Sequence, residues 1–270
     1  MTATPFRSLE EKGFEIEFVS HAKSILLGEF AEALTELESV LAELDLPITE
    51  IIGSGGGETK FTQRARKALA AMGWEKHNFE ISKIVDGVQR ESTSHEVDHV
   101  RRVAGVGTIA CEIEWNNKDP FFDRDLENFK RLHAEGAISV GILITRGKSL
   151  QDSMFDNVFR FTQERGIDSY EALAEEGYTP TPKQKAKVLK RVQRAKNPMP
   201  FAEAWTSNFV SDKYGQATTH WAKLQHRVER GVGNPCPLLL IGLPARIVRF
   251  DEQKIEELSE FDAATEETDT

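Results

Sequence analysis

Hydrophobic residues recur every three or four positions near the start of the chain. Between residues 24 and 45 the apolar positions are Ile25, Leu26, Phe30, Leu34, Leu37, Leu41 and Leu44, with acids between them. This spacing predicts one amphipathic helix whose stripe faces the core, with a dimer seam as the alternative. A second helix is predicted from Glu58 to Met72. The glycine-rich run 53–57 before it lacks the frame of a nucleotide-binding P-loop, so we expect a flexible loop there, or backbone that lies close to DNA phosphate.

The middle of the chain predicts three strands and a helix. Phe79–Val88 is the first strand-like run, and a short strand pattern carrying Asp98 follows it. A third pattern begins after Gly107 and alternates apolar and acidic residues. Asn, Asp and Pro at 116–120 end that strand, because these residues favour turns. The next helix is predicted over Asp123–His133.

The C-terminal half begins with an apolar, β-branched run at 137–147 that predicts a fully buried strand. A helix is expected over 149–166, and residues 167–200 look like an inserted basic helical segment. We expect Leu238–Ile241, together with Arg246–Phe250, to close the sheet. One domain over residues 1–250 and an acidic, partly disordered tail over 251–270 complete the expected organisation.

Three acids in the central strand patterns are candidate ligands for a cation. Glu112 and Glu114 are two residues apart, so on a strand they share one face, and Asp98 lies on the preceding strand pattern. Mg²⁺ prefers such sparse oxygen ligation and keeps water and phosphate oxygens as its other ligands. The alternative is that this acidic face is an ordinary solvated side of a sheet.

Composition restricts the class of protein. No apolar run approaches the roughly 20 residues that span a bilayer, and no secretory signal is visible at the N-terminus, so we expect a soluble, cytoplasmic protein that does not bind membranes. Cys111 and Cys236 both lie in apolar runs, which favours buried free thiols over a disulfide.

The net charge of −10 is unevenly distributed. Acids concentrate in 29–50 and in the tail, whereas bases concentrate in Lys183–Lys196 and Lys213–Arg230. An acidic back and a basic working face would suit a DNA enzyme. The alternative is that the charged helices serve only to keep the protein soluble.

The run EIEWNNKDPFFDRDLENF, followed by GAISVGILITR, resembles the BglII/BstYI-type restriction endonucleases of the PD-(D/E)xK nuclease superfamily. TTHWAKL at 218–224 and CPLLLIG at 236–242 resemble the C-terminal part of that family. The resemblance covers roughly residues 20–250. It implies an α/β (α+β) fold, in which a mixed central β-sheet is flanked by helices and carries a helical insertion.

The same resemblance assigns roles to individual residues. It makes Asp98 and Glu112 ligands of Mg²⁺ and places Glu114 where most of the superfamily has Lys, which leaves the general base open. Glu58, an acid at the start of an early helix, could join them, and Asn78 and Glu80 compete for that role. Glu58 is equally suited to complementing the dipole of its helix.

The function implied by the resemblance is Mg²⁺-dependent type II cleavage of duplex DNA at a short palindromic site, centred on GATC. A palindrome implies a homodimer, and the enzyme class implies a companion DNA methyltransferase. The residues expected to bind DNA are Asn117, Lys118, Lys213, Thr218, Thr219, His220 and Lys223. Two alternatives remain open: a non-catalytic DNA-binding protein of the same fold, and a carboxylate-pair glycoside hydrolase.

Overall fold

The computed structural model describes residues 6–53 and 58–255. They form two compact units, and each is described by itself. The sheet unit comprises residues up to 44 together with 64–148 and 219–244, and the helical unit comprises 45–63, 149–218 and the residues from 245 onward. The glycines at 55–57 and the tail from 256 lie outside the described residues, so the predictions made for them stay predictions.

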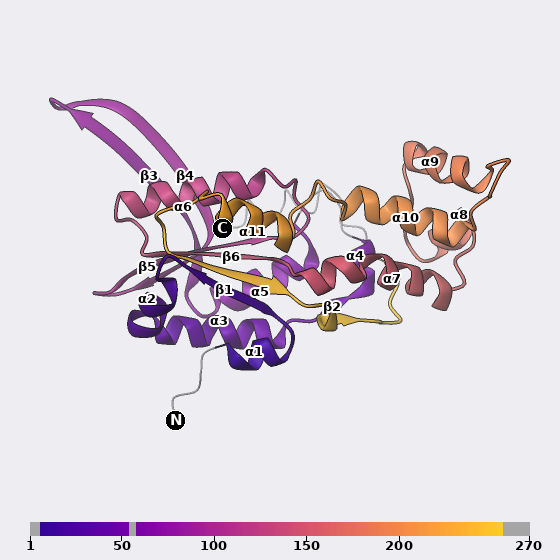
Figure 1. Cartoon of the computed structure of the whole chain (residues 1–270), viewed down its shortest axis with the longest axis horizontal. Helices are drawn as coiled ribbons and strands as arrows, with labels where there is room; N and C mark the ends of the chain where they lie inside the picture. Colours follow the sequence, from indigo (N-terminus) through magenta and orange to yellow (C-terminus); the bar gives the residue numbers. More distant parts are fainter. Residues whose placement is uncertain (1–5, 54–57, 256–270) are drawn as a thin grey trace. The chain divides into compact units, whose positions relative to one another are not determined.

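A six-stranded mixed sheet is the centre of the sheet unit (Figure 1). Its strands, in spatial order, are β1 (Glu15–Val19), β7 (Leu238–Leu243), β6 (Val140–Arg146), β5 (Gly107–Glu114), β4 (Val88–Val103) and β3 (Trp74–Val85). The three central strands β7, β6 and β5 run parallel, and the remaining neighbours pair antiparallel. The mixed sheet flanked by helices confirms the expected fold class.

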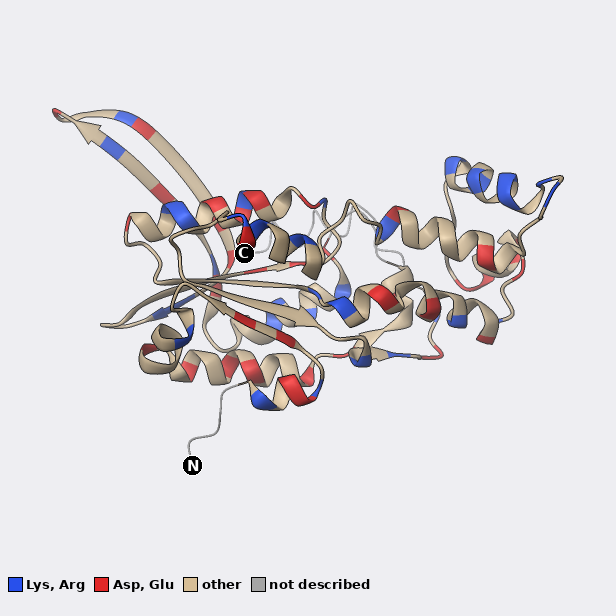
Figure 2. Ribbon diagram, viewed as in Figure 1, with Lys and Arg blue, Asp and Glu red and all other residues tan. Residues whose placement is uncertain are grey.

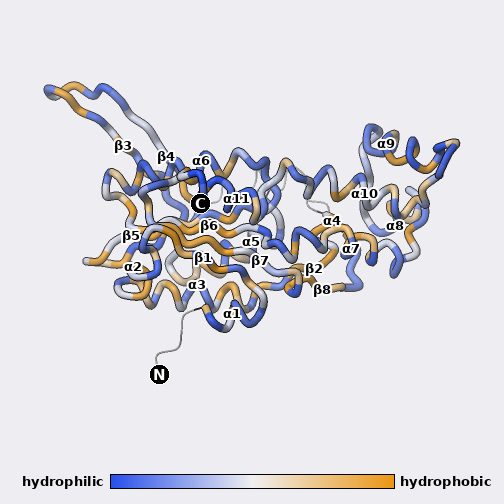
Figure 3. The backbone as a smooth tube through the Cα atoms, viewed as in Figure 1, coloured by the Kyte–Doolittle hydropathy of each residue, from blue (hydrophilic) through white to orange (hydrophobic). Residues whose placement is uncertain are grey.

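Strands β6 and β7 are buried along their whole length. Every residue of β6 and of β7 is buried, and both are rich in Leu and Ile (Figure 3). A strand covered on both faces needs no polar alternation, which is why these runs are continuously apolar in the sequence.

Helices cover both faces of this sheet (Figure 1). On one face lie α6 (Phe121–Ala134) and α11 (Trp221–Glu229), and on the other lie α2 (Ala22–Glu29) and α3 (Ala31–Glu43). The core under α6 and α11 is made of large apolar side chains, among them Phe122, Leu126, Phe129, Leu143, Leu224, Leu238 and Leu240. Short α1 (Arg7–Glu11) and the longer α5 (Lys60–Ala70) complete the N-terminal part of the chain.

The helical unit contains α4 (Ile48–Ile52), α7 (Lys148–Glu164), α8 (Tyr170–Glu175), α9 (Pro182–Val192) and α10 (Phe201–Lys213). The same unit contains a short parallel pair of strands, β2 (Leu46–Pro47) and β8 (Val248–Arg249). The 3₁₀ turn Ala245–Ile247 directly precedes β8. Aromatic rings hold α10 in place, since Trp205 stacks on Phe209 with ring centroids 5.2 Å apart and Tyr178 meets both edge-on.

Three predicted elements differ in the structure. The single helix over 24–45 is wrong: it breaks at Phe30, whose φ of −125° and ψ of 28° are not helical and whose ring is buried. The strand predicted over Phe79–Val88 is wrong at its end, because Asp86 and Gly87 have positive φ and form the turn of a hairpin. Val88 therefore begins β4.

The expected closing strand is also wrong. Residues 248–249 pair with β2 and not with the large sheet, and β7 lies inside that sheet. The edge position belongs to β1, whose residues Glu15–Val19 the sequence pattern did not predict as a strand.

One smaller expectation is confirmed by the described residues. Cys111 and Cys236 are free and buried. Among the residues that the structure describes, no helix has both the length and the apolar character needed to cross a membrane.

Candidate active site

Strand β5 turns Glu112 and Glu114 toward helix α6. Ala110 belongs to the core cluster under α6, and side chains alternate along a strand, so positions 112 and 114 point to the same face. Glu112 is 6 % exposed and Glu114 is 3 % exposed. The alternative that this acidic face is a solvated outer side is therefore wrong.

Asp98 lies at an irregularity of strand β4. His77 pairs with Val97 and Glu75 pairs with Val100, so two steps along β3 face three steps along β4. The additional residue is a β-bulge, a feature that redirects a side chain and is common beside active sites. His99 pairs with Cys111 on β5, which brings its neighbour Asp98 beside Glu112. Asp98 itself is exposed.

A fourth acid, Asp125, joins this group from helix α6 and was missed in the sequence. Its side chain is 2 % exposed and lies in the buried stripe of the helix with Phe122, Leu126 and Phe129. An acid at a stripe position of an otherwise apolar helix face was the available signal, because buried charges are rare without a partner.

Burial and mutual repulsion disfavour the charged forms of Glu112, Glu114 and Asp125. Burial raises the pKa of Glu112 well above its usual range, and the charges of Asp98, Asp125 and Glu114 raise it further. Burial also raises the pKa of Glu114 to about 8, with contributions from the charge of Asp125 and a hydrogen bond to it. Burial likewise raises the pKa of Asp125. If all four acids were ionised, their negative charge would exceed the positive charge that Arg124 supplies beside them.

Two donors contact these acids. Asn117 Nδ2 donates to Glu114 Oε2 at 2.7 Å. The guanidinium of Arg124 donates to Asp125 Oδ1 at 2.8 Å and lies 3.4 Å from Glu114 Oε1, while it covers the ring of Phe121 at 4.4 Å. Arg124 thus places a positive charge beside the carboxyl groups of Glu114 and Asp125, and the sequence pattern did not predict this role.

The four acids have the chemistry of ligands for a hard divalent cation. The atoms that could bind a metal are all carboxylate oxygens, which hard cations prefer. One of them, Asp125 Oδ2, is buried without a hydrogen-bond partner among the described residues. Over the same residues, no group of three or more His, Cys, Asp or Glu side chains is already arranged around a metal position.

The loop after β5 is tied to the start of α11. The backbone N–H of Thr219 donates to the carbonyl of Asn117 at 2.9 Å. Lys223 and Arg227 on α11 both lie near Asp119, at 3.4 and 3.5 Å. This arrangement leaves Asn117 and Lys118 exposed beside the acids.

The other residues expected to bind DNA are in different surroundings. Thr218, Thr219 and His220 are all buried, so none of them reaches a ligand in this conformation. Lys213 ends α10 and is half-buried.

The two candidates for a further acidic-site residue are not tested by the structure. Glu58 is exposed and precedes α5 in the helical unit. Asn78 is exposed on β3 opposite Glu96.

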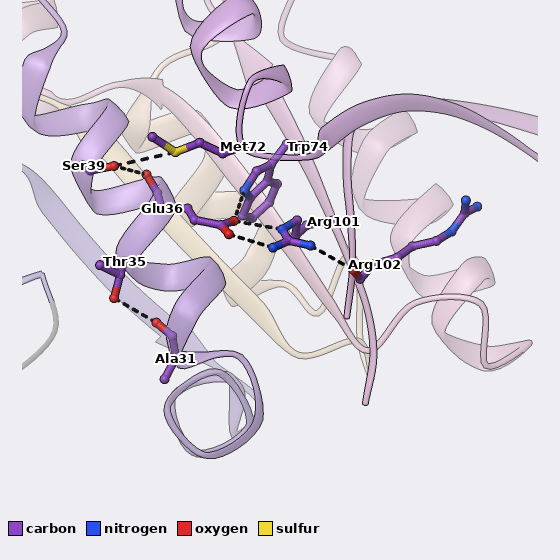
Figure 4. A network of polar contacts seen from close by, with 8 residues as sticks. All are labelled: Ala31, Thr35, Glu36, Ser39, Met72, Trp74, Arg101 and Arg102. Atoms are coloured by element: carbon purple, nitrogen blue, oxygen red, sulfur yellow. Dashed lines mark hydrogen bonds and ion pairs between the residues drawn. The ribbon is translucent and has the colours of Figure 1, made fainter. Parts of the chain in front are cut away.

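A polar network fixes strand β4, which carries Asp98, to helix α3 (Figure 4). Both oxygens of Glu36 accept hydrogen bonds from Arg101, and Trp74 Nε1 donates to Oε2 at 2.9 Å. Arg101 also donates to the carbonyl of Arg102. The network joins α3, β3 and β4 on the side of the sheet opposite α6.

The chain matches the sequence model of a known family, and no curated protein matches it. The sequence model described as "Restriction endonuclease BglII/BglIII" matches residues 14–243, which include the whole acidic group and every strand of the large sheet. The match covers most of the 270 residues. The chain therefore belongs to the BglII/BglIII family of restriction endonucleases, hydrolases that bind DNA and cut it at specific sites.

Proposed function

We propose that the protein is a Mg²⁺-dependent type II restriction endonuclease that hydrolyses phosphodiester bonds of duplex DNA at a short palindromic site. The observation that carries this proposal is the placement of Glu112 and Glu114 on the buried face of β5 toward α6, with Asp98 beside Glu112 on β4. Asp125, buried on α6, shares the guanidinium of Arg124 with Glu114. Buried acids that repel one another are stabilised by a cation, and a cation is what phosphoryl chemistry needs.

Asp98 and Glu112 are the proposed ligands. They lie on adjacent strands, and Asp98 is exposed to solvent, so it can be reached by a ligand from outside. When bound, Mg²⁺ supplies Lewis-acid polarisation of the scissile phosphate and lowers the pKa of a coordinated water.

Glu114 is the proposed positioning group for the attacking water. Its two carboxylate oxygens are oriented by Asn117 and Arg124, which limits the directions in which it can hold a proton or accept one. Arg124 offsets part of the negative charge of Glu114 and Asp125, and its exposed guanidinium can also contact a phosphate oxygen.

DNA contacts are proposed for the exposed or half-buried residues Asn117, Lys118, Lys213 and Lys223. Thr218, Thr219 and His220 remain candidates for base contacts only if their segment opens, because they are buried. We propose a site centred on GATC, a symmetric homodimer that cuts both strands, a cytoplasmic location, and a methyltransferase that protects host DNA.

The test is digestion of plasmid DNA with Mg²⁺ or with EDTA. Discrete fragments with Mg²⁺ and intact plasmid with EDTA are the expected result. DNA that is bound but never cut would leave a non-catalytic binding protein, and digestion that persists in EDTA would contradict the metal requirement.

Variants of the ligands refine the test. Asp98→Asn and Glu112→Gln should each reduce cleavage by at least about a hundredfold while DNA binding stays measurable, since such a change removes an interaction used in the transition state. Glu91→Gln is the matched control, because Glu91 is an exposed acid on the same strand β4. Full cleavage by either ligand variant would remove these residues from the site.

A further inference from the structure

Helix α9 concentrates positive charge in a chain of net charge −10 (Figure 2). From Pro182 to Lys196 there is no acidic residue, and the bases are Lys183, Lys185, Lys187, Lys190, Arg191, Arg194 and Lys196. None of these residues belongs to the acidic site described above. Like charges at this density repel one another, so their clustering has a cost unless something negative binds there.

The helix is well defined despite this repulsion. Pro182 occupies its first turn, and Thr181 and Gln184 form a capping box. Val188 is its buried residue and anchors it, and Lys185 Nζ lies 5.3 Å from the centre of the Tyr170 ring. A helix fixed in this way presents its remaining side chains in a set geometry.

Those side chains form a stripe. Lys183, Lys187 and Lys190 are spaced four and three residues apart, so they share one helix face over about 10 Å, and Arg194 follows just beyond the helix end. All four are exposed. Lys187 lies 3.8 Å from Asp212, whereas Lys183, Lys190 and Arg194 make no ion pair within the described part of the chain.

We propose that this basic stripe, Lys183, Lys187, Lys190 and Arg194, binds the sugar–phosphate backbone of duplex DNA without reading its sequence. The inference extends the proposed function, because it assigns a second surface to the same substrate. Three of the four residues are Lys, whose compact ammonium groups bind phosphate as point charges. The stripe lacks the amide and aromatic side chains that read base edges.

The test compares two triple variants of equal charge change. Lys183→Gln/Lys190→Gln/Arg194→Gln neutralises three of the four stripe residues and leaves the Lys187–Asp212 pair intact. Arg7→Gln/Lys12→Gln/Lys23→Gln neutralises three exposed bases on α1, at its C-cap and on α2. Binding to a 40-base-pair duplex of arbitrary sequence is measured by fluorescence anisotropy in EDTA across a salt series. Loss of three phosphate contacts should make the negative slope of log affinity against log salt shallower by about 2–3. It should also weaken binding roughly tenfold or more near 0.1 M salt.

The control triple variant should keep the wild-type slope. A charge-preserving variant, Lys183→Arg/Lys190→Arg, should keep it as well, which separates loss of charge from loss of folding. A wild-type slope in the neutralised stripe variant would overturn the proposal. So would a variant that loses affinity for poly-glutamate but not for DNA, since the stripe would then be a surface for acidic proteins.

The outcome is separable from that of the proposed function. A wild-type protein that binds the duplex with a stripe-dependent slope, yet never cuts plasmid DNA with Mg²⁺, would refute the nuclease mechanism and leave the stripe standing. Plasmid cleavage together with a wild-type slope in the stripe variant would support the nuclease mechanism and refute the role of the stripe.

Discussion

Arg101 on β4 donates two hydrogen bonds to Glu36 on α3, from Nε to Oε2 at 2.9 Å and from Nη2 to Oε1 at 2.7 Å. The pair is mostly shielded from solvent, with side chains 22 % and 16 % exposed. Because Arg101 lies three residues after Asp98, this contact holds the end of the strand that carries one of the proposed ligands.

Glu36→Gln should lower the free energy of unfolding by about 1 kcal/mol. The amide can still accept from Trp74, but it loses the charge-assisted pair with Arg101. Urea unfolding of the wild type and of the variant measures the difference. Glu29→Gln, an exposed acid at the end of α2, is the control and should change stability by less than about 0.5 kcal/mol.

The effect of Glu36→Gln should depend on pH. The hydrogen bond from Arg101 lowers the pKa of Glu36 below its ordinary value of 4.5. A carboxyl group with a lowered pKa in the folded state stabilises the protein above its unfolded pKa, and this contribution is lost as the pH falls through the folded value. The difference between wild type and variant should therefore be full at pH 7 and shrink below about pH 4.5. A difference that stays constant down to pH 3 would contradict the assignment.

Divalent cations should stabilise the wild type. With Mg²⁺ at 10 to 100 times its dissociation constant, the free energy of unfolding should rise by about 1–3 kcal/mol relative to EDTA. The reason is that a cation offsets the repulsion among Glu112, Glu114 and Asp125. Thermal unfolding with and without Mg²⁺ measures the gain, which Glu112→Gln should largely lose and Glu91→Gln should keep. Equal stabilisation of all three proteins would show that the ion binds elsewhere.

Two glycine-to-alanine changes should act in opposite directions. A Cβ at Gly141 on β6 would lie 2.8 Å from Cγ of Phe129 on α6, so Gly141→Ala should destabilise the protein by about 1–3 kcal/mol. A Cβ at Gly28 would meet nothing within 4 Å, and Gly28 lies within α2, so Gly28→Ala should stabilise by about 0.5–1 kcal/mol. Denaturant midpoints of the two variants give the signs directly. Unchanged stability of Gly141→Ala would mean that α6 does not pack closely on β6 at this point.

Patterns of period two and of continuous apolar character predicted the centre of the fold. The shared face of Glu112 and Glu114 follows from alternation on β5, and the buried strand β6 follows from its apolar run. Local spacing of this kind depends only on neighbouring residues, so it can be read along the chain.

Features that depend on contacts between distant segments were not predictable in the same way. The break at Phe30 arises because its ring is buried in the core, and a helical pattern continues through it. Asp125 joins the acids only because α6 packs across β5. The edge strand Glu15–Val19 is defined by pairing with β7, more than 200 residues later in the chain.

The bulge at Asp98 also constrains how related chains can be compared. Two steps along β3 are matched by three steps along β4 at this point. In a chain without the additional residue, each β4 side chain between this point and the hairpin turn would lie on the other face of the ribbon. Deleting one residue between Val97 and Val100 should therefore change which face of the ribbon each β4 side chain before the deletion occupies, and with it the burial of His95 and Val97. An alignment across this strand has to allow a gap of one residue here before the acids of different chains can be equated.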